Sequence, residues 1–280
     1  MGLNAEQLAT YERDGVVFPL DVWSRDEALA LRMRIEAIEA AHGDGLAVAD
    51  YLRGCANVVL PAIDEAMRTP AILDAVEPII GPDMLVWGCQ FFNKEPRTGG
   101  FVTWHQDLTY WGLDRTDEVT AWIALSPATV ESGCMRMIPG SHRDDIVAHR
   151  DTFAAANMLT RGQELAAPPD ESRAVDVVLE PGQMSLHHGH IFHSSGPNRS
   201  DDRRIGLAIR YIAPHMRQVA GSRDYAVLVR GEDRYGHFIE PPRPAADFAP
   251  EAVAYHDTMV ADQSRYLYRE LDPPVDRDSN

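Results

Sequence analysis

Apolar side chains follow a helical period near the N-terminus of the chain. Four of them recur at helical spacing in the segment 24–43, with arginines and glutamates between them: Ala28, Leu31, Ile35 and Ile38. Ser24 and Glu27 fit a capping box, which predicts that this helix begins next to Ser24. A second helical stretch, 70–80, ends at a Gly-Pro-Asp turn. We therefore expect a helical N-terminal part over about residues 1–82.

From Met84 onward the pattern changes to short segments rich in Val, Ile, Thr, Phe and Trp, which favour strands. Turns of Gly, Pro, Asp and Asn, rather than helices, separate these segments. The expected strand segments are 84–94, 99–112, 118–129, 133–142, 174–195 and 203–214. Consecutive strands joined by turns indicate an antiparallel sandwich or barrel and not a doubly wound parallel sheet. The predicted fold class is mainly β with flanking helices, and its core lies at about 83–215.

Two polar regions interrupt or follow the strand series. The segment at about 143–172 has mixed character and no period of two, so we expect a loop or short helix at the rim of the barrel that acts as a mobile lid. After Pro214 the chain becomes polar and rich in proline, with a helix expected near 250–270 in a C-terminal tail of about 216–280. No internal repeat or linker divides the sequence, and we expect one domain over 1–280.

Composition and charge narrow the function classes. The chain has 280 residues, 45% of them apolar and 25% charged, which is ordinary for a globular protein with a sizeable core. Its net charge of -17, from 43 acidic and 26 basic residues, repels polyphosphate backbones, so we expect neither nucleic acid nor an anionic membrane as a partner. A small-molecule substrate fits better, because local basic positions can still bind a small anion.

Cysteine usage and the first residues bear on the compartment. The three cysteines are far apart in sequence, which suggests neither a disulfide framework nor a zinc knuckle: Cys55, Cys89 and Cys134. The N-terminal residues lack the basic and apolar regions of a signal peptide, and no apolar run approaches the roughly 18 residues that a membrane span needs. We expect a cytoplasmic protein in a reducing compartment.

The segment 103–112, Thr-Trp-His-Gln-Asp-Leu-Thr-Tyr-Trp-Gly, carries the first candidate site. Side chains alternate along a strand, so His105 and Asp107 would point to the same face and could bind a metal ion together. A third ligand is available among four histidines further along the chain: His187, His188, His190 and His193. Alternation divides these four into two pairs on opposite faces, and periodicity alone does not choose between them.

An arginine in the following segment favours the last of these histidines. In a return strand of Arg-Arg-Ile-Gly-Leu-Ala-Ile-Arg-Tyr, Arg204 would lie beside the segment that carries His193 and could hold an anion bound to the same metal. One carboxylate and two imidazoles suit non-haem ferrous iron and leave three coordination positions open. The planar guanidinium can donate two hydrogen bonds to a carboxylate.

Three motifs occur in a defined order along the chain. They are Trp-His-Gln-Asp, then Gly-Cys-Met-Arg-Met-Ile-Pro-Gly-Ser-His, then His-Ser-Ser-Gly-Pro-Asn with an arginine eleven residues past its histidine. Together they resemble the phytanoyl-CoA dioxygenase family of iron(II)- and 2-oxoglutarate-dependent oxygenases, and the similarity covers most of residues 8–215. A His-x-Asp pair alone is a weak signal, whereas the ordered set is specific.

The resemblance implies a double-stranded β-helix, the cupin-like jelly roll, with iron at one open end. Matched residue by residue, the implied iron ligands are His105, Asp107 and His193, the arginine that binds 2-oxoglutarate is Arg204, and a further co-substrate contact is Ser195. Iron(II), 2-oxoglutarate and dioxygen would together hydroxylate an unactivated C–H bond of the substrate, with release of succinate and carbon dioxide.

Further residues are candidates for the walls of the site. Gln90 and Lys94 lie on the strand expected before the metal strand, and we assign Gln90, with Trp122, to the co-substrate and Lys94 to the substrate pocket. Three aromatic residues near the His-x-Asp pair could line that pocket or only pack as core and rim: Trp104, Tyr110 and Trp111. Arg204 has a plain alternative as well, a surface salt bridge with one of the aspartates just before it.

Other functions fit the same residues less well. A halogenase of this fold needs a small residue in place of the carboxylate ligand, and Asp107 occupies that position. Desaturation or cyclisation would use the same site, and a jelly-roll hydrolase or isomerase could use the same ligands for zinc. The acidic chain disfavours a large polyanion such as a coenzyme A ester, so we expect a small to medium-sized, partly apolar metabolite. The identity of the substrate and the oligomeric state stay open at this level.

Overall fold

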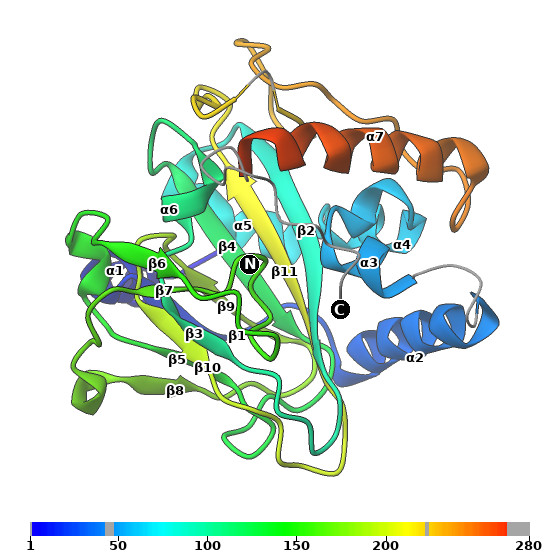
Figure 1. The fold of residues 1–280 in the computed structure, drawn as a ribbon. Helices are drawn as coiled ribbons and strands as arrows, with labels where there is room; N and C mark the ends of the chain where they lie inside the picture. Colours follow the sequence, from blue (N-terminus) through cyan, green and yellow to red (C-terminus); the bar gives the residue numbers. More distant parts are fainter. Residues whose placement is uncertain (1, 43–47, 222–223, 268–280) are drawn as a thin grey trace.

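Two antiparallel sheets face each other across a cavity in the computed structural model, which describes residues 2–42, 48–221 and 224–267 (Figure 1). The major sheet has the strand order β1-β9-β4-β11-β2-β12. Its strands are β1 (Val16–Asp21), β2 (Met84–Lys94), β4 (Glu118–Ala124), β9 (Gln183–His187), β11 (Arg204–Ile212) and β12 (Val227–Arg230). The minor sheet has the order β3-β10-β5-β8 and consists of β3 (Val102–His105), β5 (Met135–Met137), β8 (Val175–Val177) and β10 (His193–Ser195). This pairing confirms the mainly β, jelly-roll fold class.

Strand β11 organises both faces of the major sheet. It pairs antiparallel with β2 on one side and with β4 on the other, and its register runs without a shift from Arg204 to Arg210. Because side chains alternate along a strand, four apolar residues share the face that packs into the main core: Ile205, Leu207, Ile209 and Tyr211. The opposite face carries the alternate residues toward the minor sheet: Arg204, Gly206, Ala208 and Arg210.

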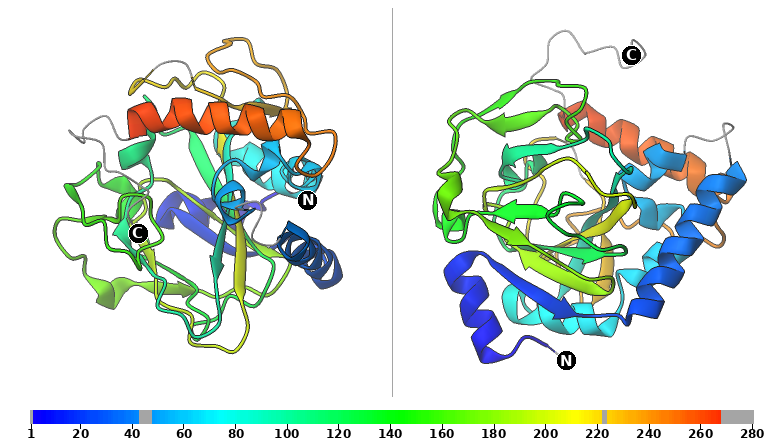
Figure 2. Two further views of the ribbon diagram at one scale, coloured as in Figure 1. Left: turned by 45° about the vertical axis from the view of Figure 1, so that its right-hand side comes forward. Right: turned by 90° about the horizontal axis from the view of Figure 1, so that it is seen from below.

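Helices cover the outer face of the major sheet, on the side away from the minor sheet (Figures 1 and 2). They are α2 (Arg25–His42), α3 (Val48–Arg53), the 3-10 helix η1 (Ala56–Val58), α4 (Pro61–Ala66) and α5 (Pro70–Ile80). The expected capping box is present at the start of α2, where the Ser24 N–H donates to a Glu27 carboxylate oxygen at 2.7 Å and the Glu27 N–H donates to Ser24 Oγ at 3.2 Å. The helices predicted at 24–43 and 70–80 are confirmed.

Two of the predicted strand segments end differently in the structure. β3 stops at His105, and the backbone becomes helical at Asp107, so the aromatic residues that follow form a short helix, α6 (Leu108–Trp111), instead of continuing the strand. The histidine run lies on two strands and not on one, since His187 ends β9 and His193 begins β10. Apolar content alone does not mark where an extended backbone turns.

The rim segment at about 143–172 contains a hairpin, where the sequence predicted a loop or short helix. β6 (His149–Asp151) pairs with β7 (Gln163–Leu165), and the 3-10 helices η2 (Ser141–Arg143) and η3 (Glu171–Arg173) flank the pair. The Met158 N–H, in the hairpin loop, donates to the carbonyl oxygen of Phe101 at 2.9 Å, which ties the loop to the chain just before β3. Strands of three polar residues carry too little alternation to be recognised from sequence.

Elements near the chain ends complete the fold. α1 (Ala5–Asp14) precedes β1, which joins the major sheet within the part expected to be helical, and β12 adds an edge strand within the expected tail. α7 (Pro250–Leu267) confirms the helix expected near 250–270 up to Leu267, and the residues after it lie outside the described part. No helix of the described residues is long and apolar enough to cross a membrane. All three cysteines are free thiols.

Candidate metal centre and co-substrate pocket

Three side chains suited to holding a metal ion converge between the two sheets. His105 comes from the end of β3, Asp107 from the turn after it, and His193 from the start of β10, directly across from His105. One ligand atom from each lies within 4.8 Å of the others. The distance to Asp107 Oδ1 is 3.2 Å from His105 Nε2 and 3.8 Å from His193 Nε2. The structure thus brings together the three residues that the sequence indicated.

Both imidazole rings are oriented by carbonyl groups of their own chain segments. His105 Nδ1 lies 2.9 Å from the carbonyl oxygen of Thr103, and His193 Nδ1 lies 3.0 Å from that of Ile191. A carbonyl oxygen can only accept a hydrogen bond, so each Nδ1 carries the proton and each Nε2 keeps a lone pair on the side of Asp107. When both imidazoles are neutral, each presents an Nε2 lone pair to the space that also holds the Asp107 carboxylate.

Burial sets the charge state of these ligands. His193 is 7% exposed, and burial, reinforced by the charge of His105, lowers the pKa of His193 to about 4, so its ring is neutral at pH 7. Burial raises the pKa of Asp107, but the neighbouring groups His105, His193 and Arg210 outweigh burial and lower that pKa well below its usual range. Neutral imidazole and ionised carboxylate are the states that bind a divalent cation, so this donor set fits Fe2+.

Arg204 lies in the same cavity with its charge unpaired. It is 1% exposed, it forms no ion pair with any described residue, and its Nε has no hydrogen-bond partner among them. Its guanidinium carbon lies 5.3 Å from the ring centre of Trp122 on β4. The surface salt bridge considered for Arg204 is therefore wrong. The two aspartates before it bind other arginines instead, since Asp201 pairs with Arg97 and Asp202 with Arg32.

Lys94 and Ser195 meet beside Arg204. Lys94 stands directly across from Arg204 in the β2–β11 register, and its Nζ donates to Ser195 Oγ at 2.7 Å and to the carbonyl oxygen of Gly196. Burial, reinforced by the charge of Arg204, lowers the pKa of Lys94 to about 6, so the amine is mostly neutral at pH 7. The sequence analysis placed Lys94 in the substrate pocket, whereas the structure favours the end of the cavity that holds Arg204.

Gly206 creates the space that Trp122 occupies beneath Arg204. A Cβ at Gly206 would lie 1.8 Å from Cζ2 of the Trp122 ring, so Gly206→Ala must displace the indole. We expect this variant to lose about 1–3 kcal/mol of stability from overpacking. It should also bind 2-oxoglutarate more weakly than the wild-type chain, because the ring under Arg204 moves. Thermal unfolding and calorimetric titration of 2-oxoglutarate measure the two effects.

The matched control for this variant is Gly99→Ala, because a Cβ at Gly99 meets no atom within 4 Å. We expect Gly99→Ala to unfold and to bind 2-oxoglutarate like the wild-type chain. Unchanged 2-oxoglutarate binding by a folded Gly206→Ala would show that Trp122 contributes nothing to the co-substrate.

A second buried arginine, Arg210, lies on the same face of β11 at the other end of the cavity. It is 7% exposed, its Nη1 donates to Gln90 Oε1 at 2.8 Å, and its guanidinium carbon lies 5.0 Å from the ring centre of Trp111. Trp111 itself is buried against Trp87, with 4.9 Å between the ring centres. Gln90, which the sequence analysis gave to the co-substrate, therefore sits with Arg210 and not with Arg204. Alternation along β11 could have identified Arg210, since it lies an even number of residues from Arg204.

The remaining histidines of the run take no part in the metal cluster. His187 is buried with its ring centre 5.3 Å from that of His193, and burial lowers the pKa of His187 to about 3. His188 and His190 lie in the turn between β9 and β10, where His188 Nδ1 accepts a hydrogen bond from the His190 N–H at 3.0 Å. The cluster of the described residues contains neither of these two nor His187.

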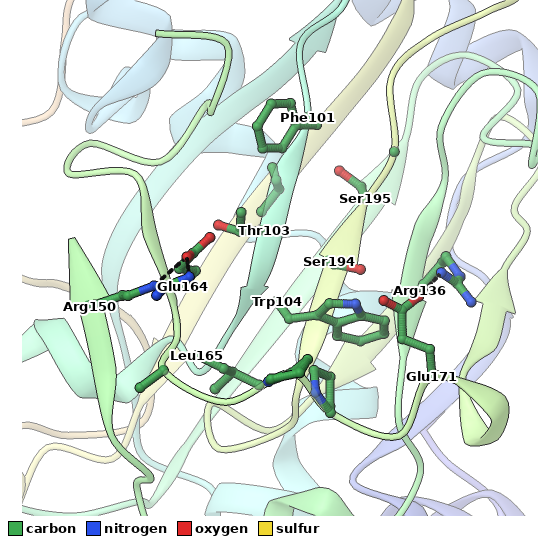
Figure 3. A pocket seen from close by; sticks show the side chains of 15 residues that line it. Phe101, Thr103, Trp104, Arg136, Arg150, Glu164, Leu165, Glu171, Ser194 and Ser195 are labelled. Atoms are coloured by element: carbon green, nitrogen blue, oxygen red, sulfur yellow. Dashed lines mark hydrogen bonds and ion pairs between the residues drawn. The ribbon is translucent and has the colours of Figure 1, made fainter. Parts of the chain in front are cut away.

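Trp104 points away from the metal cluster, because it is adjacent to His105 on β3 and side chains alternate along a strand. His193 pairs with His105, but Ser195 pairs with Val102, so β3 has one more residue than β10 over this span. Val102 and His105 both line the metal cavity. Trp104 instead lines a larger groove on the outer face of the minor sheet (Figure 3). The geometry of the metal cavity therefore gives no support to Trp104 as a substrate contact.

The outer groove lies between β3 and the β6–β7 hairpin (Figure 3). Trp104 projects into it beside Arg136, whose guanidinium carbon lies 5.7 Å from the indole ring centre, and Arg150 bonds to Glu164 on the hairpin side. None of the three metal-ligating candidates lines this groove. Tyr110 lies at the foot of the hairpin, where its ring makes an edge contact with His149 at 5.7 Å. Of the three aromatic candidates, Trp111 lies against Arg210, which lines the metal cavity.

Comparison with known proteins places these motifs in a family. The family described as Phytanoyl-CoA dioxygenase (PhyH) matches residues 11–206 of the chain. The probable alpha-ketoglutarate-dependent hypophosphite dioxygenase of Stutzerimonas stutzeri is 30% identical over 172 residues, which are 60% of this chain and 59% of that protein. The L-proline trans-4-hydroxylase of Streptomyces griseoviridis is 28% identical over 228 residues, which are 72% of this chain and 83% of that protein. The chain spans about half the length of several curated relatives that it matches.

A solved structure shares the whole fold. It is the non-heme monooxygenase ThoJ in its apo form, which is 34% identical to this chain with a TM-score of 0.83. The match covers 95% of this chain and 99% of that one. The jelly roll, the flanking helices and the strands that carry the metal-ligating candidates are therefore shared over almost the full length of both proteins.

Proposed function

The chain belongs to the phytanoyl-CoA dioxygenase family, and on this premise we propose that it is an iron(II)- and 2-oxoglutarate-dependent dioxygenase. Its proposed reaction hydroxylates an unactivated C–H bond of a small to medium-sized metabolite and releases succinate and carbon dioxide. The observation that carries the proposal is one buried cavity lined by His105, Asp107, His193 and an unpaired Arg204. A metal-ligating set next to an unpaired buried arginine suits a co-substrate that has two carboxylates.

Different residues of the cavity are proposed to bind the iron and the co-substrate. His105, Asp107 and His193 would hold the iron, which when bound couples the activation of dioxygen to the decarboxylation of 2-oxoglutarate. Arg204 would donate two hydrogen bonds to the distal carboxylate of the co-substrate, and Ser195 would add a hydroxyl donor on the same side. Lys94 positions Ser195 through its 2.7 Å hydrogen bond. Burial of all these groups excludes water from the reacting C–H bond.

Succinate release tests the proposal directly. The protein with iron(II), 2-oxoglutarate and dioxygen should form succinate, and formation should stop when zinc replaces iron or when dioxygen is removed. Anaerobic titration of the iron complex with 2-oxoglutarate should give a charge-transfer absorption band, a readout that does not need turnover. A zinc-dependent hydrolase or isomerase would show neither signal, and this result would reject the proposed reaction.

The rim hairpin is proposed to close over the substrate. Leu159, in its loop, already lines the metal cavity, while three apolar side chains of the segment are exposed: Ile146, Val147 and Phe153. We expect trypsin to cut the iron and 2-oxoglutarate complex rapidly after Arg150 or Arg161, and more slowly once a compound that stimulates succinate release is added. Cleavage after the exposed Arg234, which is remote from the hairpin, should be unaffected by that compound. Equally slow cleavage of the hairpin in both states would mean a fixed insertion.

A further inference from the structure

Arg210 is a buried cation that the proposed iron and co-substrate chemistry does not use. It forms no ion pair with any described residue, and its Nε has no hydrogen-bond partner among them. Its hydrogen bond to Gln90 uses one N–H donor of the guanidinium, but Gln90 is neutral and does not compensate the positive charge. Burial of an unpaired charge is unfavourable, so a protein that keeps one beside a cavity has reason to present it to a ligand.

The carboxylates nearest to this end of the cavity are already engaged. Asp107 belongs to the metal cluster. Asp224 accepts hydrogen bonds from Trp87 Nε1 at 2.6 Å and from Gln263 Nε2 at 3.0 Å, as well as from a backbone N–H. Glu118 accepts the N–H of Gly189, and burial raises its pKa well above the usual value. None of these three carboxylates forms an ion pair with Arg210, although the charge of Arg210 helps to lower the pKa of Asp107.

The sheet is built so that the Arg210 side chain lies along the cavity wall. Gly88 stands directly across from it in the β2–β11 register, and a Cβ at Gly88 would lie 3.5 Å from Arg210 Nη1. On the other side Thr120 of β4 stands across from Arg210, and His187 stands across from Thr120. Arg210, Thr120 and His187 thus form a row across three neighbouring strands. This row ends next to the metal cluster, since the ring centre of His187 lies 5.3 Å from that of His193. A group held by Arg210 would thus be close to the metal.

Arg210 lies six residue steps after Arg204 on one regular strand, about 20 Å along the backbone. Both line the cavity that contains the metal cluster. The distal carboxylate of the proposed co-substrate occupies the position at Arg204. The position at Arg210 is then left for the other molecule that enters the site.

We propose that Arg210, together with Gln90, binds a carboxylate group of the oxidised substrate and so restricts the substrate class to small carboxylic acids. This inference rests on the proposed function. One guanidinium and one amide suit a single carboxylate, because its two oxygens can accept two parallel hydrogen bonds from the guanidinium N–H groups. A phosphate monoester carries nearly two charges at pH 7 and would leave one of them unpaired here. Trp111, behind the guanidinium, holds its plane in position.

The test uses the anaerobic complex of the full chain with iron(II) and 2-oxoglutarate, and matched probe pairs that differ only in charge. The pairs are hexanoate with hexanamide, 3-phenylpropanoate with 3-phenylpropanamide, and L-amino acids with their carboxamides; phenyl phosphate forms a separate arm. We expect acids to bind and to stimulate succinate release on admission of air, with amides weaker by at least tenfold. Arg210→Gln should reduce acid binding by on the order of 100-fold, the loss of a buried charge-assisted pair, and Arg210→Lys should restore part of it.

Thermal unfolding gives a readout that a merely structural arginine would not give. Because Arg210 is unpaired, we expect Arg210→Gln to unfold at the same temperature as the wild-type chain or higher. An acid probe should raise the unfolding temperature of the wild-type complex and not that of the variant. The control is Arg34→Gln on α2, an exposed arginine paired with Asp247, which should behave like the wild-type chain throughout.

Four results would overturn the inference. They are equal binding of acids and amides, stronger effects of phenyl phosphate than of any acid, loss of iron binding in Arg210→Gln, and failure of every acid to bind. Loss of iron binding would assign Arg210 to the support of Asp107 instead. In each case, succinate formation and the 2-oxoglutarate absorption band of the wild-type protein report separately on the proposed function, so the two failures are distinguishable.

Discussion

His193→Ala should abolish iron binding and 2-oxoglutarate turnover while leaving a folded protein. The substitution removes one of three metal ligands and leaves only His105 and Asp107, both from one end of β3. Loss of an outer partner of a metal ligand already costs roughly 10–100-fold in affinity or activity, so loss of a ligand itself should exceed that. Iron content after dialysis and initial rates of succinate release measure the effect.

The neighbouring histidines provide the control for this variant. His188→Ala and His190→Ala change residues of the turn before β10 that are not part of the cluster, so both should retain iron. Circular dichroism and thermal unfolding would show that His193→Ala remains folded. If His188→Ala or His190→Ala lost iron while His193→Ala kept it, the choice of His193 as the third ligand would be wrong.

Arg204→Ala should raise the apparent KM and the dissociation constant for 2-oxoglutarate by on the order of 100-fold or more. The substitution removes a buried charged partner of the distal carboxylate. Arg204→Lys keeps the charge but loses the two-pronged geometry, and we expect about a tenfold rise, equivalent to about 1.4 kcal/mol. Initial rates against 2-oxoglutarate concentration and calorimetric titration in the absence of dioxygen measure these constants independently.

The neighbouring Arg203 provides a matched control. Arg203 is also an arginine of the same motif, yet it pairs at the surface with Glu39 at 2.8 Å and with Glu95 at 2.8 Å. Arg203→Ala should leave the 2-oxoglutarate constant unchanged. An unchanged constant for both Arg204→Ala and Arg204→Lys would move the co-substrate anchor to another residue, with Lys94 the first to test.

Several helices and strands could be predicted from strong local sequence patterns. The capping box of Ser24 and Glu27 and the long apolar strands at 84–94 and 203–214 appear in the structure at the expected positions. Such elements have many residues that agree on one period, so a local reading suffices. The β6–β7 hairpin and the break at His105 could not be predicted in this way, since each depends on contacts with distant segments.

The site shows the same division between local and long-range information. Motif order indicated His105, Asp107 and His193, and these lie together in the structure. The roles of Gln90 and Lys94 depended on the register between β2 and β11, which places Lys94 across from Arg204 and Gln90 near Arg210. The extra residue in β3 could not be predicted from local alternation, and it brings Val102 to the metal cavity beside His105, while Trp104, adjacent to His105, lines the outer groove.

The uninterrupted register of β11 has a consequence for regioselectivity. Between Arg204 and Arg210 the strand pairs with β2 without a bulge, and from Gly206 onward it also pairs with β4, so the backbone positions that carry the two arginines are fixed relative to each other. A substrate acid bound by Arg210 would then place one particular carbon next to the metal. The number of bonds between that carbon and the carboxylate would be set by the fixed position of Arg210 on the strand. In a homologous series of acids, the hydroxylated carbon should keep the same number of bonds from the carboxylate as the far end of the chain lengthens.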